Sequence, residues 1–368
     1  MRRILCALLA LPLLALACST SKGASSVPRD PVLVEGSFVR FPEGTTVKVV
    51  AHDSFVVSES VLAEFTAATG ITVQIIPSGD AVAMTNAAIL TAGNPTGDVL
   101  FGIDENLLGS AFAAELFSPY VAQRIGDVDP RFVIDGEHRV TPIDHGDVCV
   151  NFDRAAFAAS PLPSTFADLA STSNRNRFVT EDPATSTPGL AFMLATIAQF
   201  GGGGDTTANA PWLQYWKSLK AAGVQIVDSW ETAYYGAFSG GSGKGTKPLV
   251  TSYASSPPAE VADTSLAVDS TPTGVITSTC YRQTEFAGVL RGAAQPRAAQ
   301  AFIEFMLGQS FQADMPGQMY VYPVVAATPL PDTFAKYTAP VSKPLSLPYE
   351  EVTANRDRWL TQWASVFR

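Results

Sequence analysis

The chain has 368 residues and a formal net charge of −10, with 24 Lys and Arg against 34 Asp and Glu. This acidic balance disfavours nucleic acid and anionic membrane surfaces as partners. With 46% hydrophobic and 16% charged residues, the composition is that of a globular protein, and no apolar run beyond the N-terminus is long enough to cross a membrane.

The N-terminus has the pattern of a lipoprotein signal peptide. A basic start precedes an apolar run from Ile4 to Ala17, which is too short to span a bilayer, and small residues stand before Cys18. We therefore expect a signal peptide at 1–17, cleavage before Cys18, and acylation of its thiol, which anchors the protein to the outer face of a membrane. Residues 18–43 are rich in Ser, Pro and Gly and predict a flexible tether. An ordinary secretory signal with an incidental cysteine is the alternative.

Strand-like and helix-like segments alternate in the next part of the chain. The pattern predicts strands at Val47–Ala51, Thr72–Ile76 and Asp98–Gly102, and helices at Glu59–Thr69, Ala81–Ala92 and Glu105–Ala114. Such alternation is typical of a mainly parallel sheet covered on both faces, in which ligands bind at the carboxyl ends of the strands. Those ends carry His52, Asp53, Asp80 and Asp104, so the sequence predicts a cleft lined by carboxylates.

A second α/β region follows, and about 350 residues after the signal are enough for two compact lobes. We expect strands at Val148–Phe152, Phe178–Glu181, Val224–Val227, Leu249–Tyr253 and Tyr281–Val289, and helices at Pro211–Ala222, Pro296–Leu307, Phe311–Met315 and Tyr349–Phe367.

The segment Asp182–Leu190 stands between a short strand and an apolar helix. Thr187 is predicted as the N-cap and Pro188 as the first helical residue, because proline loses nothing where its N–H has no intrahelical partner. The helix start then offers N–H groups and a positive dipole end to a phosphate or hydroxyl. An ordinary strand-to-helix turn with nothing bound is the alternative.

Six short segments, in this order, resemble the periplasmic thiamine-binding proteins of bacterial ABC importers. They are His52–Phe55, Gly102–Leu108, Asp182–Leu190, Ser229–Tyr234, Leu249–Pro257 and Tyr322–Val324. Each segment alone is weak evidence, but six in register are specific. The resemblance covers roughly residues 47–367, nearly all of the chain after the signal peptide and tether.

The resemblance implies an α/β, two-lobe periplasmic-binding-protein (type II) fold. Each lobe would be a mainly parallel sheet flanked by helices, with crossing strands as the hinge. The implied boundaries are 44–145 with 282–330 for lobe 1, and 146–281 with 331–368 for lobe 2. The implied function is capture of thiamine or its phosphates between the lobes and delivery to the permease and ATPase subunits of an ABC importer, without cofactor or metal.

The resemblance also implies which residues bind the ligand. Asp80 and Ala81 would contact it through a carboxylate and a helix start, and Ser186 and Trp230 would hold its hydroxyl or phosphate. Tyr253 would form a hydrogen bond, and Tyr320 stands where the family usually has tryptophan.

Three positions depart from the family pattern. His52 replaces a tyrosine, Glu59 replaces a tryptophan that stacks on the ligand, and Ala259 replaces a second stacking tyrosine. Losing both stacking faces costs on the order of 1–3 kcal/mol each. Glu59 is expected to offset part of this loss by pairing with a cationic ligand in the closed cleft. A different cationic or pyrimidine ligand is therefore the alternative within this fold.

Two cysteines remain after the signal peptide and the anchor, Cys149 and Cys280. Both lie in strand-like runs, at the places where the family's chain passes between the lobes. An even pair outside the cytoplasm is compatible with a disulfide, and two buried free thiols are the alternative.

The sequence contains no pattern for catalysis or for a metal cluster. None of His52, His138 and His145 belongs to a hydrolase motif, and no Cys and His residues have metal-ligand spacing. Adjacent tyrosines bind ferric ion in some receptors of this fold, so Tyr234–Tyr235 keeps ferric ion as an alternative ligand. An extracellular enzyme that uses Asp53, Asp104 or Asp182 is a further alternative.

Overall fold

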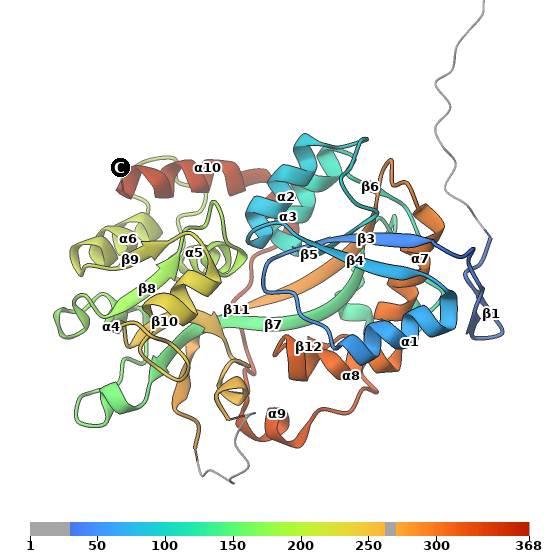
Figure 1. Cartoon of the computed structure of the whole chain (residues 1–368). Helices are drawn as coiled ribbons and strands as arrows, with labels where there is room; N and C mark the ends of the chain where they lie inside the picture. The colour runs from blue at the N-terminus through green and yellow to red at the C-terminus, as the bar shows by residue number, and fades with distance from the viewer. Residues whose placement is uncertain (1–29, 262–269, 368) are drawn as a thin grey trace, which may run out of the picture.

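The computed structural model describes residues 30–261 and 270–367, and its centre is a ten-stranded sheet that runs across the molecule (Figure 1). The predicted signal peptide and Cys18 lie outside the described residues. The strand order is β4–β3–β5–β11–β7–β10–β8–β9, with β6 paired to β11 and β12 to β7. The bounds are β3 Thr46–Ala51, β4 Thr72–Pro77, β5 Val99–Asp104, β6 Phe117–Ser118, β7 Thr141–Asp153, β8 Phe178–Glu181, β9 Gln225–Val227, β10 Leu249–Tyr253, β11 Thr273–Leu290 and β12 Tyr322–Pro323.

The sheet consists of two parallel sets joined by antiparallel strands. β3 pairs in parallel with β4 and β5, and β8 pairs in parallel with β9 and β10. The strands between these sets, β11 and β7, are antiparallel to each other and to their neighbours β5 and β10. The predicted α/β arrangement, with a mainly parallel sheet in each half and crossing strands between, is confirmed.

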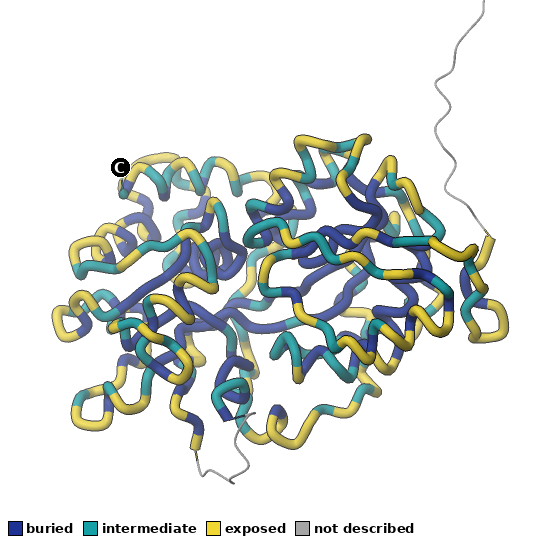
Figure 2. Tube along the Cα trace, viewed as in Figure 1, coloured by how far each residue is buried: buried dark blue, intermediate teal, exposed yellow. Residues whose placement is uncertain are grey.

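Helices cover both faces of the sheet, because successive side chains of β3 point to opposite faces and are buried on both. Val49 belongs to a core cluster with Phe65 and Phe302, whereas the next residue, Val50, packs in a second cluster with Val82. The helices are α1 Glu59–Thr69, α2 Ala81–Leu90, α3 Glu105–Ala113, α4 Phe166–Leu169, α5 Thr187–Phe200, α6 Pro211–Ala221, α7 Pro296–Met306, α8 Gln309–Gln318, α9 Asp332–Tyr337 and α10 Tyr349–Phe367. Figure 2 shows the buried residues concentrated in the central strands and the inner helix faces. No helix among the described residues is long and apolar enough to span a bilayer.

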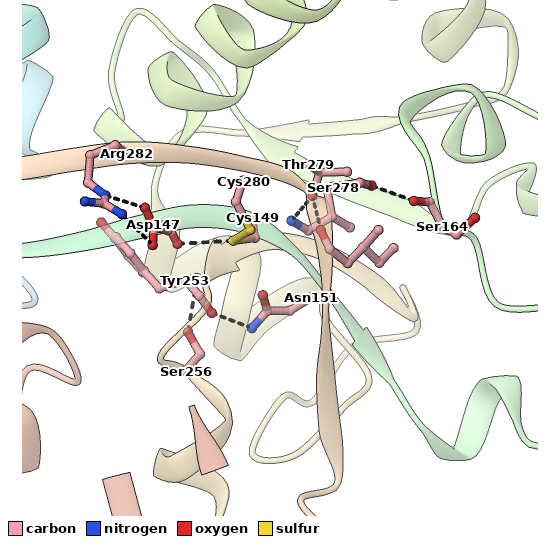
Figure 3. The surroundings of a disulfide bond; sticks show 12 residues. Asp147, Cys149, Asn151, Ser164, Tyr253, Ser256, Ser278, Thr279, Cys280 and Arg282 are labelled. Atoms are coloured by element: carbon pink, nitrogen blue, oxygen red, sulfur yellow. Dashed lines mark hydrogen bonds and ion pairs between the residues drawn. A yellow bond between two sulfur atoms is a disulfide. The ribbon is translucent and has the colours of Figure 1, made fainter. Parts of the chain in front are cut away.

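A disulfide joins the two crossing strands where their register is interrupted (Figure 3). β11 pairs with β7 on both sides of residues 277–280, and Cys280, at the end of this bulge, is bonded to Cys149. Within the bulge the hydroxyl of Thr279 accepts the N–H of Val150 at 2.9 Å, replacing a ladder hydrogen bond. The two cysteines therefore form a disulfide in the structure and are not two buried free thiols.

The C-terminal helix packs on both halves of the molecule, although its residues were predicted to belong to lobe 2 alone. α10 contacts α6 in the second half and α3 in the first half, and Figure 1 shows it extending from one toward the other. The contact with α3 is close because Gly109 has no side chain. A Cβ atom built on Gly109 would lie 2.4 Å from Cγ2 of Thr353 on α10. Sequence periodicity identifies the helix but not its partners.

The predicted tether is too long at its C-terminal end. Leu33–Val34 (β1) and Ser37–Phe38 (β2) form a hairpin, and Val32 is buried. The ring of Phe38 packs edge-on against Phe65 of α1, with ring centroids 6.0 Å apart. These apolar residues interrupt the polar composition, so the folded body begins by residue 32.

We expect Gly109→Ala to destabilise the protein by about 1–3 kcal/mol, because the added methyl group overlaps Thr353 and forces α10 away from α3. Urea unfolding measures the loss. Gly317→Ala is the matched control, since Gly317 is also helical and a Cβ atom there meets nothing within 4 Å. If the two variants are equally stable, the close α3–α10 contact does not exist in solution.

Candidate ligand-binding cleft

A cavity of about 200 Å³ lies at the carboxyl ends of the parallel strands and is lined from both halves of the sheet. The first half contributes the loop after β3, the start of α2, Glu285 on β11 and the segment that follows α8. The second half contributes the start of α5 and the segments after β9 and β10. The lining residues are His52, Asp53, Ser54, Val56, Asp80, Ala81, Thr187, Pro188, Ser229, Trp230, Glu231, Tyr234, Tyr235, Tyr253, Ser256, Ala259, Glu285, Gln318, Met319, Tyr320 and Val321.

Six of the eight residues predicted to bind the ligand line this cavity, namely His52, Asp80, Ala81, Trp230, Tyr253 and Tyr320. The structure does not bring Glu59 or Ser186 to its surface. Glu59 is exposed on the first turn of α1, whose preceding residue, Ser58, is held by hydrogen bonds to Asp314. Ser186 is fully buried. The expectation that Glu59 pairs with a cation in the cleft therefore has no support in the observed position of this residue.

Asp80 connects the two halves across the cavity. It is the N-cap of α2 and accepts the N–H of Ala81 at 2.7 Å. The same carboxylate accepts the N–H of Thr187 at 3.3 Å and the N–H of Trp230 at 3.1 Å, both from the second half of the sheet. Burial raises the pKa of Asp80 above its ordinary value, and the hydrogen bond from Trp230 opposes this shift.

The start of α5 differs by one residue from the prediction. Ser186 rather than Thr187 is the N-cap, and its side chain forms no capping hydrogen bond. Thr187 is the first helical residue, and its N–H donates to Asp80. The cap thus comes from a carboxylate more than a hundred residues earlier in the chain, which local sequence rules cannot reveal.

An aromatic wall occupies the second half of the cavity. The rings of Trp230 and Tyr234 are stacked with centroids 5.0 Å apart, and Tyr235 meets Trp230 edge-on at 5.4 Å. Tyr234 is 2% exposed and Tyr235 is 45% exposed, so Tyr235 is the more accessible of the two adjacent tyrosines. The indole N–H of Trp230 donates to the hydroxyl of Ser252 at 3.0 Å, which fixes the orientation of the ring.

The aromatic segment after α8 completes the wall. Tyr320 has a φ of 54°, a left-handed backbone conformation that is uncommon for a residue other than glycine. Such strain tends to persist where surrounding structure requires it, frequently at ligand sites. Tyr320 and its neighbour Met319 both line the cavity.

A row of buried carboxyl groups lies beneath the cavity. Glu285 on β11 is paired with Asp104 on β5 and with Asp144 on β7, so the three side chains are cross-strand neighbours. Burial raises the pKa of Asp104 to about 7, with Glu285 adding to the shift, and burial next to Glu285 raises the pKa of Asp144 well above its ordinary value. Glu285 is the member of this row that reaches the cavity.

His52 faces Glu285, with Nε2 of His52 3.8 Å from Oε2 of Glu285. Burial lowers the pKa of His52, but the interactions with Glu285, Asp80 and Asp53 together outweigh burial and raise the pKa above its ordinary value of 6.5. The imidazole ring lies over Gly102, where a Cβ atom would stand 2.3 Å from Cδ2 of His52. Gly102 therefore leaves the space that this ring occupies.

Sequence reasoning missed Glu285 and the accessible face of Tyr235. The carboxyl ends of parallel strands predict ligand contacts, whereas Glu285 lies inside the crossing strand β11. A carboxylate followed by the apolar run from Phe286 was the available signal, since ionised side chains are rarely buried without a partner.

The structure gives no support to the alternative that the bound solute is ferric ion. Among the described residues, no group of three or more His, Cys, Asp and Glu side chains could hold a metal ion. The hydroxyl of Tyr234 donates to Glu260 at 2.6 Å, so the adjacent pair Tyr234–Tyr235 does not present two available phenol groups to the cavity.

Comparison with known proteins agrees with this architecture. Residues 60–341 match the family model described as bacterial extracellular solute-binding protein. Over 292 residues, covering 79% of this chain and 82% of the relative, the chain is 30% identical to the thiamine-binding periplasmic protein of Escherichia coli K12. It is 28% identical to the protein of the same name from Salmonella typhimurium LT2, over 86% of this chain and 91% of the relative.

A solved structure described as a periplasmic thiamin binding protein superposes with a TM-score of 0.75 and 27% identity, covering 89% of this chain and 99% of that chain. The fold and the cleft are those of a receptor that encloses a small solute between two lobes. The chain belongs to the bacterial extracellular solute-binding proteins. It is thus an extracytoplasmic binding protein and not an enzyme, and the resemblance observed in its sequence is confirmed.

The raised pKa of Asp104 predicts a pH-dependent stability. Between its ordinary value of 3.8 and about 7, the folded chain keeps a proton on Asp104 that the unfolded chain has released, so the free energy of unfolding falls as the pH rises through this range. Asp104→Asn removes the titration and keeps an oxygen that can accept the N–H of Asn106.

We expect Asp104→Asn to be more stable than the unaltered protein by more than about 1 kcal/mol near pH 8, and to lose this advantage near pH 4. Urea unfolding at the two pH values measures the difference, and the exposed Asp127→Asn serves as the control. An equal effect of Asp104→Asn at both pH values would contradict the raised pKa.

Proposed function

We propose that this protein captures thiamine in the cavity between its lobes and delivers it to the permease and ATPase subunits of an ABC importer. The observation that carries the proposal is the composition of the cavity, in which aromatic rings and carboxylates meet while none of the lining residues of the described chain is Lys or Arg. The relatives that are named as thiamine-binding proteins support the same ligand.

The cavity suits the chemistry of thiamine. The thiazolium ring of thiamine is a permanent cation, and aromatic faces attract cations and stack on flat rings. Trp230, Tyr235 and Tyr320 supply such faces, and Glu285 and Asp80 supply negative charge. Glu59 and Ala259 replace two aromatic residues that stack on the ligand in the family. Tyr235 offers an aromatic face that can stack on the ligand in their place. Another cationic or pyrimidine compound of similar size is the remaining alternative ligand.

We propose that capture works by closure of two lobes, 44–145 with 282–330 and 146–281 with 331–368, where the hairpin of residues 33–38 adds to the first lobe and α10 contacts both. The proposed pivot lies near Gly146 and Tyr281 on the crossing strands β7 and β11. Gly146 faces the ring of Tyr253 so closely that a Cβ atom there would lie 3.2 Å from it. A ligand drives closure only through contacts that are better in the closed state, so it must touch both lobes at once.

Calorimetric titration of the purified protein with thiamine tests the ligand. We expect one-to-one binding, and a loss of affinity of about tenfold or more in Trp230→Ala, because this variant removes a stacking face. Trp230→Phe keeps an aromatic face but cannot donate to Ser252, and should retain most of the affinity. No heat from thiamine with a folded sample would contradict the proposed function.

We further propose that residues 1–17 are a lipoprotein signal peptide and that acylated Cys18 anchors the protein to the outer face of the membrane. The small residues before Cys18 and the short apolar run support this interpretation. A single acyl chain binds membranes weakly, so firm anchoring requires the two or more chains that bacterial lipoproteins carry.

Fatty-acid labelling and cell fractionation test the anchor. We expect the unaltered protein to carry the label and to sediment with membranes, and Cys18→Ser to lose the label. Cys6→Ser is the matched control, because Cys6 lies within the proposed signal peptide and should leave labelling unchanged. A labelled Cys18→Ser protein would contradict the proposed anchor.

A further inference from the structure

The short helix that carries Tyr234 and Tyr235 is a π-helix, Thr232–Ala237. The N–H of Phe238 donates to the carbonyl of Ala233, five residues earlier, at 2.9 Å, which is the π-helical spacing. Such turns are rare and frequently lie at functional sites. This one stands beside the cavity, since both tyrosines line it.

A glycine-rich loop, residues 239–247, folds back over the end of this helix. The N–H groups of Lys244 and Lys247 donate to carbonyls of its last turn at 3.0 and 2.9 Å, respectively. Carbonyls at a helix end lack intrahelical partners, so the loop supplies the missing donors. A Cβ atom on Gly245 would overlap the backbone of Ala237, which is why glycine is needed at this close approach.

Glu260 fastens this loop to Tyr234. The hydroxyl of Tyr234 donates to Oε1 of Glu260 at 2.6 Å, and the N–H of Ser242 donates to Oε2 at 2.6 Å. The hydroxyl of Ser242 donates to Oε1 as well, at 3.2 Å. A Cβ atom on Gly241 would overlap the carboxyl group, so the loop passes as close to it as glycine permits. One side chain therefore joins the loop to the helix.

The contacts of Glu260 extend to Trp230 through Tyr234. The rings of Tyr234 and Trp230 are stacked with centroids 5.0 Å apart. The indole of Trp230 is thus held in two ways, by its N–H bond to Ser252 and by the ring behind it. Glu260 fixes the second of these supports but does not itself line the cavity.

We propose that Glu260 is a positioning residue for ligand binding, which holds the stacking face of Trp230 in place through the hydroxyl of Tyr234. The glycine-rich loop in turn holds Glu260 through Ser242. The inference rests on the proposed function, because the ring that it concerns is the one proposed to stack on thiamine. Glu260 acts without touching the ligand.

Calorimetric titration with thiamine measures the effect on affinity. We expect Glu260→Ala to weaken binding by about fivefold, because the ring of Tyr234 is no longer fixed behind Trp230. Glu260→Gln keeps an oxygen that can accept the hydroxyl of Tyr234 and should retain most of the affinity. If Glu260→Gln binds as weakly as Glu260→Ala, the charge of Glu260 and not its hydrogen bond supports binding, and the proposal is overturned.

A double-mutant cycle tests the route through Tyr234. Tyr234→Phe keeps the stacked ring and removes the hydroxyl, so it should weaken binding by a similar factor. In the Tyr234→Phe background, Glu260→Ala should then add a further loss of less than about twofold. Losses that multiply in the double variant would overturn this route. If Glu260→Ala does not fold, Tyr234→Phe decides alone, and unchanged affinity contradicts the proposal.

Tryptophan fluorescence reports the position of the Trp230 ring without a ligand. Trp230 is half-buried, whereas the other four tryptophans of the chain are 0–4% exposed, namely Trp212, Trp216, Trp359 and Trp363. Acrylamide in solution therefore quenches mainly Trp230. We expect stronger quenching in Glu260→Ala and in Tyr234→Phe than in the unaltered protein, and equal quenching would overturn the positioning role.

Tyr120→Phe is the matched control. Tyr120 also donates its hydroxyl to a carboxylate, that of Glu304 on α7, at 2.5 Å. Neither residue lines the cavity. The variant removes the same kind of hydrogen bond from the first half of the molecule, and it should leave both thiamine affinity and quenching unchanged.

The two measurements separate this inference from the proposed function. If thiamine binds equally well to the unaltered protein and to folded Glu260→Ala, the proposed function stands and the inference is overturned. If thiamine does not bind but Glu260→Ala increases quenching, the proposed function fails, and the role of Glu260 in holding the ring of Trp230 is supported.

Discussion

The antiparallel pairing of β7 and β11 is the interaction on which the rest of the structure depends. Each parallel set of strands attaches to one of these two long strands, β5 to β11 and β10 to β7. Between them stand the disulfide Cys149–Cys280 and the ion pair of Asp147 with Arg282 at 2.5 Å, which Figure 3 shows side by side. Because both halves of the sheet attach to this pair, the cleft between the halves has a defined geometry.

The cleft concentrates acidic groups, and the structure reduces the cost of burying them in two ways. Asp80 accepts three backbone N–H groups, which favours its charged form. Asp104 and Asp144, beneath the cavity, have raised pKa values, so a proton on each lessens the repulsion from Glu285. The resulting cavity combines negative charge with the rings of Trp230 and Tyr235, and this combination complements a flat organic cation.

Local patterns predicted most of the elements, because alternating apolar residues and helix starts are properties of short segments. α1 begins and ends where the sequence placed it, and the strand ends carrying His52, Asp80 and Tyr253 do line one cavity. The sequence was less informative about packing. The polar composition before residue 43 concealed the hairpin that contains Val32 and Phe38, and periodicity could not show that α10 contacts both halves.

The sequence by itself determined the fold class, the family and the carboxyl-end position of the cleft, since each depends on order and spacing along the chain. Only the tertiary structure decided the chemistry of the cleft. It brought Glu285 from the middle of β11 to the cavity, left Glu59 exposed, and placed the carboxylate of Asp80 on the N–H groups of Thr187 and Trp230. These contacts join residues up to 150 positions apart, and no local rule of propensity or capping reaches across such a separation.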